Sequence, residues 1–150
     1  MPQSFAQLYA HLVFSAKNRE RWLNDEIRPR VHAYIAGIVR GLDARYVVVG
    51  GVADHVHVLF DMGKMHAAVD FVSEVKRESS KFVKTLGNQY RRFYWQRGYG
   101  LFSVSPDRKA DVESYVRNQE EHHRGVTFQD EFRDLLRRCD IEWDERFVWD

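Results

Sequence analysis

Apolar residues repeat along the chain with two different periods, and each change of period predicts a change of secondary structure. Alternating or β-branched apolar runs predict strands at residues 8–14, 46–49 and 54–61. Apolar positions spaced three and four apart predict helices at residues 25–41 and 66–86. Asn24 or Asp25 can cap the first of these helices, Pro29 fits its first turn, and Gly41 and Gly87 can end the two helices.

The second half of the chain predicts one more strand and two more helices. Residues 93–104 are typical of a strand that is interrupted or bulged near Gly98 and Gly100. A helix is expected at about residues 105–124, and a final one at residues 128–138.

The order of these elements predicts the fold. Gly50 and Gly51 offer a turn or bulge between the second and third strands, so the order is β-α-β-β-α-β followed by C-terminal helices. This is the α+β ferredoxin-like plan, an antiparallel four-stranded sheet in which the first and third strands are central. No repeat or Pro/Gly-rich linker divides the chain, so residues 1–150 are expected to form a single domain.

Composition excludes several classes of protein. A hydrophobic fraction of 44% and a charged fraction of 30% describe a globular chain rather than a disordered one. No apolar run approaches the length of a membrane span, and the first residues lack the pattern of a signal peptide. Cys139 is the single cysteine, which excludes an internal disulfide and favours a cytoplasmic location.

Charge is unevenly distributed although the net charge is only +1. Residues 64–106 carry eight Lys/Arg against three Asp/Glu, whereas residues 107–150 carry eight against thirteen. A basic segment on a near-neutral protein fits a polyanion bound in one groove, although a solvated helix face explains the same charges. The candidate nucleic-acid contacts, here called the basic block, are Lys76, Arg77, Lys81, Lys84, Arg91, Arg92 and Arg97.

The triplet His55-Val56-His57 lies in the third predicted strand. Side chains two residues apart share a face of a strand, so both imidazoles should point the same way, with Cα atoms about 6–7 Å apart. Such a pair can bind a divalent metal and leave positions open for phosphate and water. The alternative is that these histidines only fill a partly buried site.

Tyr115 and Gln119 are four residues apart in a predicted helix and therefore share a face. A tyrosine beside a metal-binding amide suggests a nucleophile for phosphodiester chemistry, although a helical tyrosine more often only packs. His122 lies seven residues after Tyr115 and could reach a phosphate or the metal. For His122, and still more for His123, we expect a solvated or helix-capping role instead.

Taken together, these motifs resemble a known family. The run Asp-His-Val-His-Val-Leu-Phe around His55 and His57 is similar to the His-hydrophobic-His motif of HUH nucleases. The order of the motifs resembles the single-tyrosine HUH transposases of bacterial insertion sequences, of the IS200/IS605 type, over nearly the whole chain. The segments that extend the resemblance are residues 95–100, 102–105, 115–123 and 144–146.

The resemblance implies a definite chemistry. Members bind hairpins in single-stranded DNA at transposon ends, and Tyr115 would attack the backbone to leave a 5′-phosphotyrosine and a free 3′-OH. His55, His57 and Gln119 would hold Mg²⁺ or Mn²⁺. No nucleotide cofactor is expected, which agrees with the absence of a phosphate-binding loop motif from the sequence. The resemblance also implies a homodimer, no membrane partner, and action on DNA in a bacterial or archaeal cytoplasm, in association with the nucleoid.

Two alternatives remain open at the level of sequence. Another HUH nuclease, a relaxase or replication initiator, would share the histidine pair, but the short chain and single candidate tyrosine favour a transposase. A non-catalytic single-stranded nucleic-acid-binding module could use the same fold with aromatic residues on the sheet. Metal-dependent covalent trapping of a DNA oligonucleotide distinguishes an enzyme from such a module.

Overall fold

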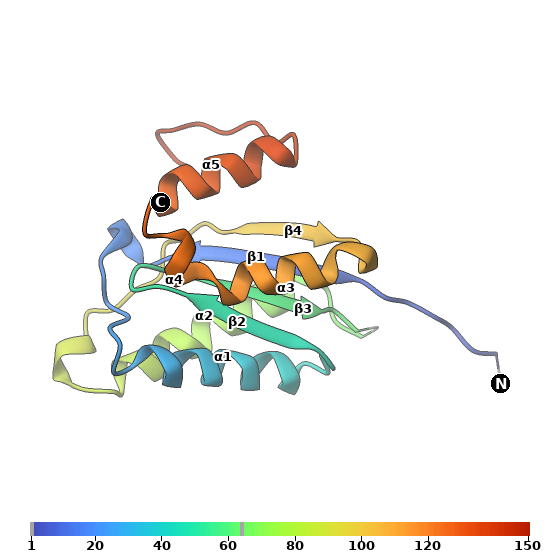
Figure 1. Ribbon diagram of the computed structural model, residues 1–150. Coiled ribbons are helices and arrows are strands. Elements are labelled where there is room, and N and C mark those ends of the chain that lie inside the picture. Colours follow the sequence, from blue (N-terminus) through green and yellow to red (C-terminus); the bar gives the residue numbers. More distant parts are fainter. Residues whose placement is uncertain (1, 64) are drawn as a thin grey trace.

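The computed structural model describes residues 2–63 and 65–150, which form a four-stranded antiparallel sheet with helices on both faces (Figure 1). The strands lie side by side in the order β2-β3-β1-β4. Their bounds are Tyr9–Ser15 for β1, Val47–Gly51 for β2, His55–Asp61 for β3 and Gly100–Val104 for β4. β1 and β3 are central, so the predicted ferredoxin-like plan is confirmed.

Helices cover the two faces of the sheet unequally (Figure 1). One face carries α1 (Arg28–Gly41) and α2 (Ala68–Lys84). The other face carries α3 (Lys109–Arg117), α4 (Gln119–His122) and α5 (Phe128–Arg138). Three short 3₁₀ turns connect these elements at Lys17–Arg19, Asn88–Tyr90 and Pro106–Arg108.

Alternation along β3 decides which side chains meet which helices. The apolar residues that face α1 and α2 in the main core are Val56, Val58 and Phe60, each fully buried. Burial of one such side chain stabilises the fold by on the order of 2 kcal/mol, which holds β3 at the centre of the sheet. His55, His57 and Leu59 point to the opposite face, where Leu59 packs against Val116 of α3.

The structure corrects the predicted end of the second strand. Gly50 and Gly51 do not form a turn; both belong to β2 and pair with His57 and Val56. A Cβ atom on Gly50 would lie 1.8 Å from the carbonyl oxygen of Val116. Glycine is therefore required here because the backbone of α3 lies directly against β2.

The structure also shortens the predicted fourth strand. β4 begins at Gly100, and earlier in the segment only Trp95 forms a bridge, with Ala16 just after β1. The side chain of Gln96 accepts a hydrogen bond from the Ser15 N–H at 2.8 Å, where a strand would offer a main-chain carbonyl. The ladder is thus interrupted between the Trp95 bridge and Gly100, near the glycines where the sequence predicts an interruption.

Helix boundaries differ from prediction in three places, the smallest difference being α2, which is two residues shorter at each end than the predicted residues 66–86. The helix expected at residues 105–124 is divided at Asn118, whose backbone (φ −99°, ψ 28°) separates α3 from α4. Asn is a poor residue for a helix interior, which fits this break. α1 begins at Arg28 because Asn24 Oδ1 accepts the N–H groups of Glu26 and Ile27 in a preceding turn. α5 has the predicted bounds.

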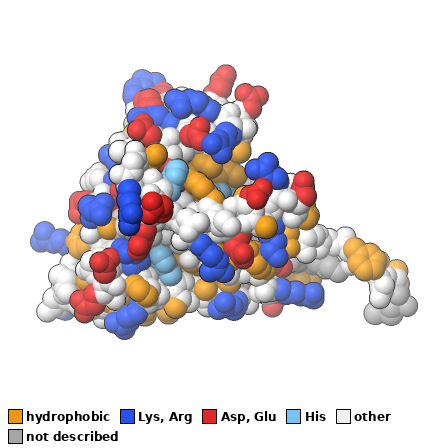
Figure 2. All heavy atoms as spheres, viewed as in Figure 1, with side chains coloured by type: hydrophobic (Ala, Val, Ile, Leu, Met, Phe, Trp, Pro, Cys, Tyr) orange, Lys and Arg blue, Asp and Glu red, His pale blue; other side chains and the backbone are white. Residues whose placement is uncertain are grey.

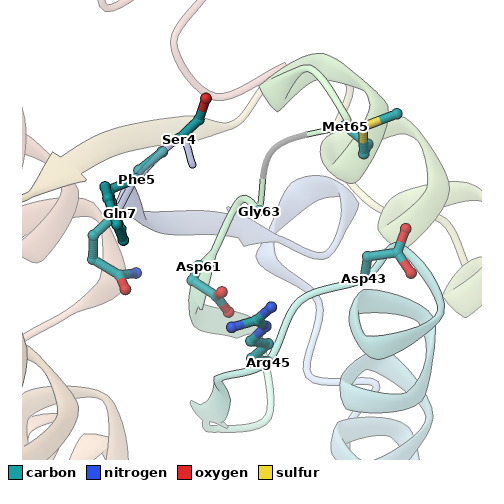
Figure 3. Close-up of a pocket in the computed structure, with 9 residues that line it drawn as sticks. Ser4, Phe5, Gln7, Asp43, Arg45, Asp61, Gly63 and Met65 are labelled. Carbon is teal, nitrogen blue, oxygen red and sulfur yellow. The ribbon is translucent and has the colours of Figure 1, made fainter. Parts of the chain in front are cut away.

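A cavity of about 680 Å³ lies at the end of the sheet away from His55 (Figure 3). The extended N-terminal segment forms one wall with Ser4, Phe5 and Gln7, and Asp43 and Arg45 lie across from it (Figure 3). The histidine pair does not line this cavity, so its size does not make it the functional site. Among the described residues, no helix is long and apolar enough to cross a membrane.

The space around two glycines predicts opposite effects on stability when each is replaced by alanine. Gly50→Ala should force α3 away from β2 and lower the free energy of unfolding by roughly 1–3 kcal/mol. Gly37 lies within α1, and a methyl group added there would meet no atom within 4 Å, so Gly37→Ala should raise stability by up to about 1 kcal/mol. Urea unfolding measures both; a Gly50→Ala protein as stable as the parent would contradict the contact.

Candidate metal and tyrosine site

Two imidazoles lie side by side on β3, beneath the C-terminal helices. The rings of His55 and His57 are 5.1 Å apart between centroids, and both side chains are fully buried. Each ring is held at Nδ1: His55 by Asp54 Oδ1 at 2.7 Å, and His57 by His11 Nε2 at 2.8 Å. Both Nε2 atoms are therefore left to face the space between the sheet and α5.

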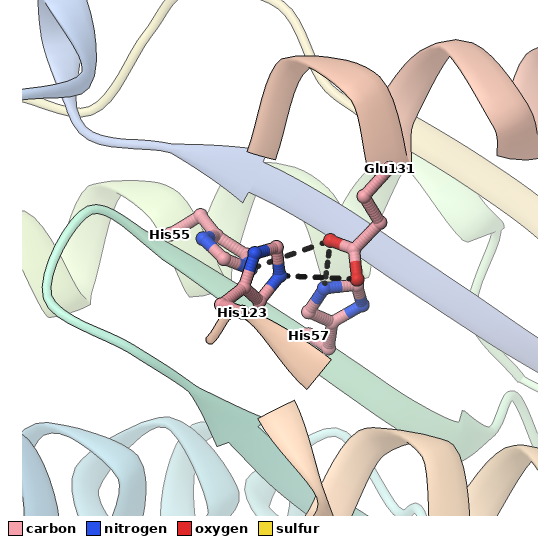
Figure 4. Close-up of side chains that lie close together, drawn as sticks. All are labelled: His55, His57, His123 and Glu131. Atoms are coloured by element: carbon pink, nitrogen blue, oxygen red, sulfur yellow. Dashed lines mark hydrogen bonds and ion pairs between the residues drawn. The ribbon is translucent and has the colours of Figure 1, made fainter. Parts of the chain in front are cut away.

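A carboxylate from α5 occupies this space. Glu131 Oε1 lies 2.9 Å from His57 Nε2 and 3.4 Å from His55 Nε2 (Figure 4). Its other oxygen, Oε2, lies 3.1 Å from Nε2 of His123, which follows α4 (Figure 4). One donor atom from each of these four side chains falls within 4.8 Å of all the others, so together they could hold a metal ion.

Gln119, the first residue of α4, is also part of the cluster. Its side-chain oxygen lies 3.1 Å from His55 Nε2 and 2.9 Å from His123 Nε2. Its amide nitrogen donates to the backbone carbonyl of Tyr115 at 3.1 Å, which fixes the orientation of the amide. The oxygen of Gln119 is therefore directed at the histidines although α3 and α4 are not one continuous helix.

Tyr115 reaches the cluster from α3. Its hydroxyl donates a short hydrogen bond to Glu131 Oε2, and its ring centroid is 5.6 Å from that of His57. Burial and the neighbouring Glu131 carboxylate raise the pKa of the Tyr115 phenol well above its usual range. With these groups alone around it, the phenol keeps its proton, and a positive charge nearby would favour the loss of that proton.

Three ionisable groups of the cluster have divergent pKa values. Burial alone would raise the pKa of Glu131, but hydrogen bonds from His123, His55 and His57 hold it far below its usual range. Burial alone would lower the pKa of His55, but the Asp54 and Glu131 carboxylates raise it to about 9. Burial lowers the pKa of His57 to about 4. The cluster thus holds an ionised carboxylate beside one protonated and one neutral imidazole.

This donor set fits a divalent cation. Imidazole nitrogens suit ions such as Zn²⁺ and Fe²⁺, whereas carboxylate and amide oxygens suit Mg²⁺ and Mn²⁺, so these side chains do not by themselves select one divalent metal. The hydrogen bond between Asp54 and His55 Nδ1 is the arrangement that orients metal-binding histidines in many proteins. A cation would also supply a positive charge that favours deprotonation of Tyr115.

The structure brings together His55, His57, Tyr115 and Gln119, the four residues selected from sequence. Their roles stay predictions. His123 is the residue that caps the C-terminal end of α4, which is one of the two roles expected for it, but it is not solvated, because its side chain is only 8% exposed and contacts Glu131. His122 is 33% exposed, with Nε2 3.2 Å from Glu131 Oε2.

Sequence reasoning missed Glu131 and His11, which reach the cluster from α5 and β1. Glu131 belongs to an amphipathic helix that carries other acidic residues as well, so no local signal distinguishes it. The alternation of β1 could have indicated His11, since Ala10 and Leu12 on either side of it face the main core.

The basic block lies near the end of the sheet where His55 lies. Four of its members are on α2, however, and α2 covers the face of the sheet opposite to the histidine cluster. Several members are engaged within the protein: Lys76 donates to the carbonyls of Arg97 and Gly98, and Arg77 pairs with glutamates on α2. Burial lowers the pKa of Lys76 to about 8. The members that are exposed and form no ion pair within the described part of the chain are Arg91, Arg92 and Arg97.

Surface charge elsewhere is mixed. On the face shown in Figure 2, Lys/Arg and Asp/Glu side chains are interspersed over the C-terminal helices and over α1. Many of these charges are paired along one helix, for example Arg138 with Asp134 at 2.9 Å. Exposed pairs of this kind contribute little to stability and keep the local potential low.

Comparison with known families gives one match that covers most of the chain. The family described as "Transposase IS200 like" matches residues 4–119. The ISDra2 transposase TnpA of Deinococcus radiodurans is 24% identical over 118 residues, covering 75% of this chain and 84% of the relative. The transposase for insertion sequence element IS200 of Salmonella typhimurium is 26% identical over 119 residues, covering 76% and 78%.

Solved structures share the fold. A candidate transposase from Deinococcus radiodurans R1 superimposes with a TM-score of 0.62 at 23% identity, covering 79% of this chain and 98% of the other. A REP-associated tyrosine transposase, solved bound to a REP hairpin, superimposes with a TM-score of 0.53 at 13% identity, covering 77% and 67%. At these identities the likeness establishes the fold.

Proposed function

The chain belongs to the IS200-like transposase family, and we propose that it cleaves and rejoins single-stranded DNA at hairpin-bearing ends through a covalent 5′-phosphotyrosine at Tyr115. The observation that carries this proposal is the position of the Tyr115 hydroxyl, against a mostly buried cluster of side chains that could hold a metal ion. The same proposal places the protein on DNA in association with the nucleoid of a bacterial or archaeal cytoplasm.

The reaction follows from the groups around Tyr115. Its phenolic oxygen forms a bond to the phosphorus of a DNA phosphodiester, and the bond from phosphorus to the 3′-oxygen breaks. The proton lost by the phenol is balanced by the proton that the departing 3′-oxygen takes up. The hydrogen bond to Glu131 orients the hydroxyl, and the contacts of the partly buried ring with His57 limit its rotation. Attack of the released 3′-OH of another strand on the phosphotyrosine reverses the step and rejoins DNA.

His55, His57 and Gln119 are proposed to hold Mg²⁺ or Mn²⁺ through Nε2, Nε2 and Oε1. A bound cation of this kind would neutralise the scissile phosphate and favour the phenolate. Asp54 and His11 keep the two rings in place from behind, and Gln119 is held by the carbonyl of Tyr115. This last hydrogen bond links the position of the metal ligand to that of the nucleophile.

Removing the Tyr115 hydroxyl should abolish covalent chemistry and preserve binding. Tyr115→Phe is expected to reduce cleavage by at least roughly 10³-fold, the scale on which loss of a nucleophile acts. Its control is Tyr99→Phe, at a tyrosine 44% exposed and outside the cluster. Denaturing gels of the protein with a labelled single-stranded end oligonucleotide detect the adduct.

Two outcomes of this experiment would contradict the proposal. An adduct that persists in Tyr115→Phe would place the nucleophile at another residue. A parent protein that binds the oligonucleotide but forms no adduct with Mg²⁺ or Mn²⁺ would favour the non-catalytic single-strand binder.

The histidine pair should be required for the same reaction. His55→Ala and His57→Ala are each expected to eliminate metal-dependent cleavage while circular dichroism still shows a folded protein. His66→Ala is the control, because His66 lies outside the cluster and pairs with Asp43 at an exposed position. Normal cleavage by both β3 variants at saturating Mg²⁺ or Mn²⁺ would refute the metal role.

We propose that the basic block contacts the DNA backbone. The triple substitution Arg91→Gln, Arg92→Gln and Arg97→Gln should weaken hairpin binding and flatten its salt dependence, by a slope of about 0.7 for each lost single-strand phosphate contact. The matched control neutralises three arginines on or just after α1, namely Arg30, Arg40 and Arg45. Fluorescence anisotropy at several salt concentrations measures the slope, and an unchanged slope in the first variant would reject the contact.

We also propose a homodimer. β2 is an edge strand of the sheet, and Val47 and Val49 on it are only partly buried. An apolar edge of this kind can pair with the same edge of a second copy. Light scattering at micromolar concentration should give twice the 17.8 kDa of one chain, and a mass near 17.8 kDa would contradict the dimer.

A further inference from the structure

Glu131 is the one carboxylate in the four-residue cluster, and it comes from a part of the chain beyond the family match. The matched region ends at residue 119, whereas Glu131 lies on α5. Its side chain is 1% exposed. A buried glutamate is uncommon unless it is paired or binds a metal, so this placement calls for a physical reason.

Histidines are the ionisable partners that could neutralise Glu131 at close range. Within the residues that the structure describes, its ion pairs are all with imidazoles: His55, His57, His122 and His123. No arginine or lysine there forms an ion pair with it. Imidazoles bind metals in their neutral form, so a metal held by His55 and His57 would itself have to balance the carboxylate.

The distances suit a shared ion. Ligand atoms held about 2.0–2.2 Å from one ion lie roughly 3 to 4.3 Å from each other. Glu131 Oε1 is 2.9 Å from His57 Nε2 and 3.4 Å from His55 Nε2, which is the separation expected for neighbouring ligands. The other oxygen, Oε2, stays bonded to the Tyr115 hydroxyl. One carboxylate can therefore face the metal with one oxygen and the nucleophile with the other.

α5 presents this carboxylate rigidly. Thr127 caps the helix by accepting a hydrogen bond from the Asp130 N–H, and Phe128 and Phe132 pack against β1 and β4 in a second apolar cluster. The ring of Phe128 also stacks on His55, with centroids 4.6 Å apart. The position of Glu131 is thus fixed by the packing of Phe128 and Phe132 as well as by the ion pairs of its carboxylate.

We propose that Glu131 is a ligand of the divalent cation, so that α5 closes the metal site over His55 and His57. This inference rests on the proposed metal-dependent function and adds a ligand to it. Binding of the cation then stabilises the docking of α5, and the docked helix holds the Tyr115 hydroxyl beside the metal.

Metal binding without DNA tests the ligand directly. Isothermal titration of the intact protein with Mn²⁺ should show affinity at least tenfold weaker for Glu131→Gln than for the parent. Asp134→Asn, the matched control one turn along α5, removes an exposed carboxylate that pairs with Arg138 and should leave the affinity unchanged. Equal affinity in Glu131→Gln would overturn the proposal. Tighter binding would also overturn it, because Glu131 would then compete with the metal for the histidines.

Hydrogen exchange of the parent protein provides a test that needs no variant. Amides of residues 128–138 should exchange more slowly when Mn²⁺ is added, and a helix α5 that exchanges at the same rate with saturating metal would overturn the proposal. The experiments distinguish failure of the proposed Glu131 ligand from failure of the proposed metal-dependent function. Mn²⁺ binding that requires His55 and His57 but not Glu131 would leave the proposed function intact, whereas a parent protein that binds no Mn²⁺ would remove its metal site altogether.

Discussion

The burial of two imidazoles on the central strand is the constraint on which the rest of this site depends. His55 and His57 are fully enclosed, and a buried polar group left without a partner costs roughly 1–3 kcal/mol. Every element around them supplies a partner: β1 offers His11, the turn before β3 offers Asp54, and α5 offers Glu131. The polar face of the sheet is thus as specifically packed as the apolar one.

One face of the sheet carries the main apolar core, and the other carries the candidate functional site. On one face, α1 and α2 bury a large apolar core, which holds β1 and β3 in register. On the other, apolar contacts are split into two smaller clusters, one under α3 and one under α5. The histidines lie between those clusters, so the apolar contacts on either side determine how closely Tyr115 and Glu131 approach them.

Because the helix breaks at Asn118, Tyr115 and Gln119 are held by two different helices. Tyr115 belongs to α3, which is fixed against β2 by the contact of Val116 with Gly50, whereas Gln119 begins α4. A hydrogen bond from the Gln119 amide to the Tyr115 carbonyl still joins them. The nucleophile and the proposed metal ligand are therefore coupled by one local contact, while their distances from β3 are set by separate elements.

The sequence by itself determined the features that depend on short-range periodicity. Alternation places His55 and His57 on one face of a strand, four-residue spacing relates Tyr115 to Gln119, and the helix predicted at residues 128–138 has the bounds of α5. Only the tertiary structure decided that His123 and Glu131 join them. Glu131 contacts His57 across 74 residues of sequence, and no local pattern encodes which buried partner a helical carboxylate will meet. That choice depends on how α5 docks, and docking is decided by the apolar contacts of the whole helix rather than by the polar residue that it carries into the site.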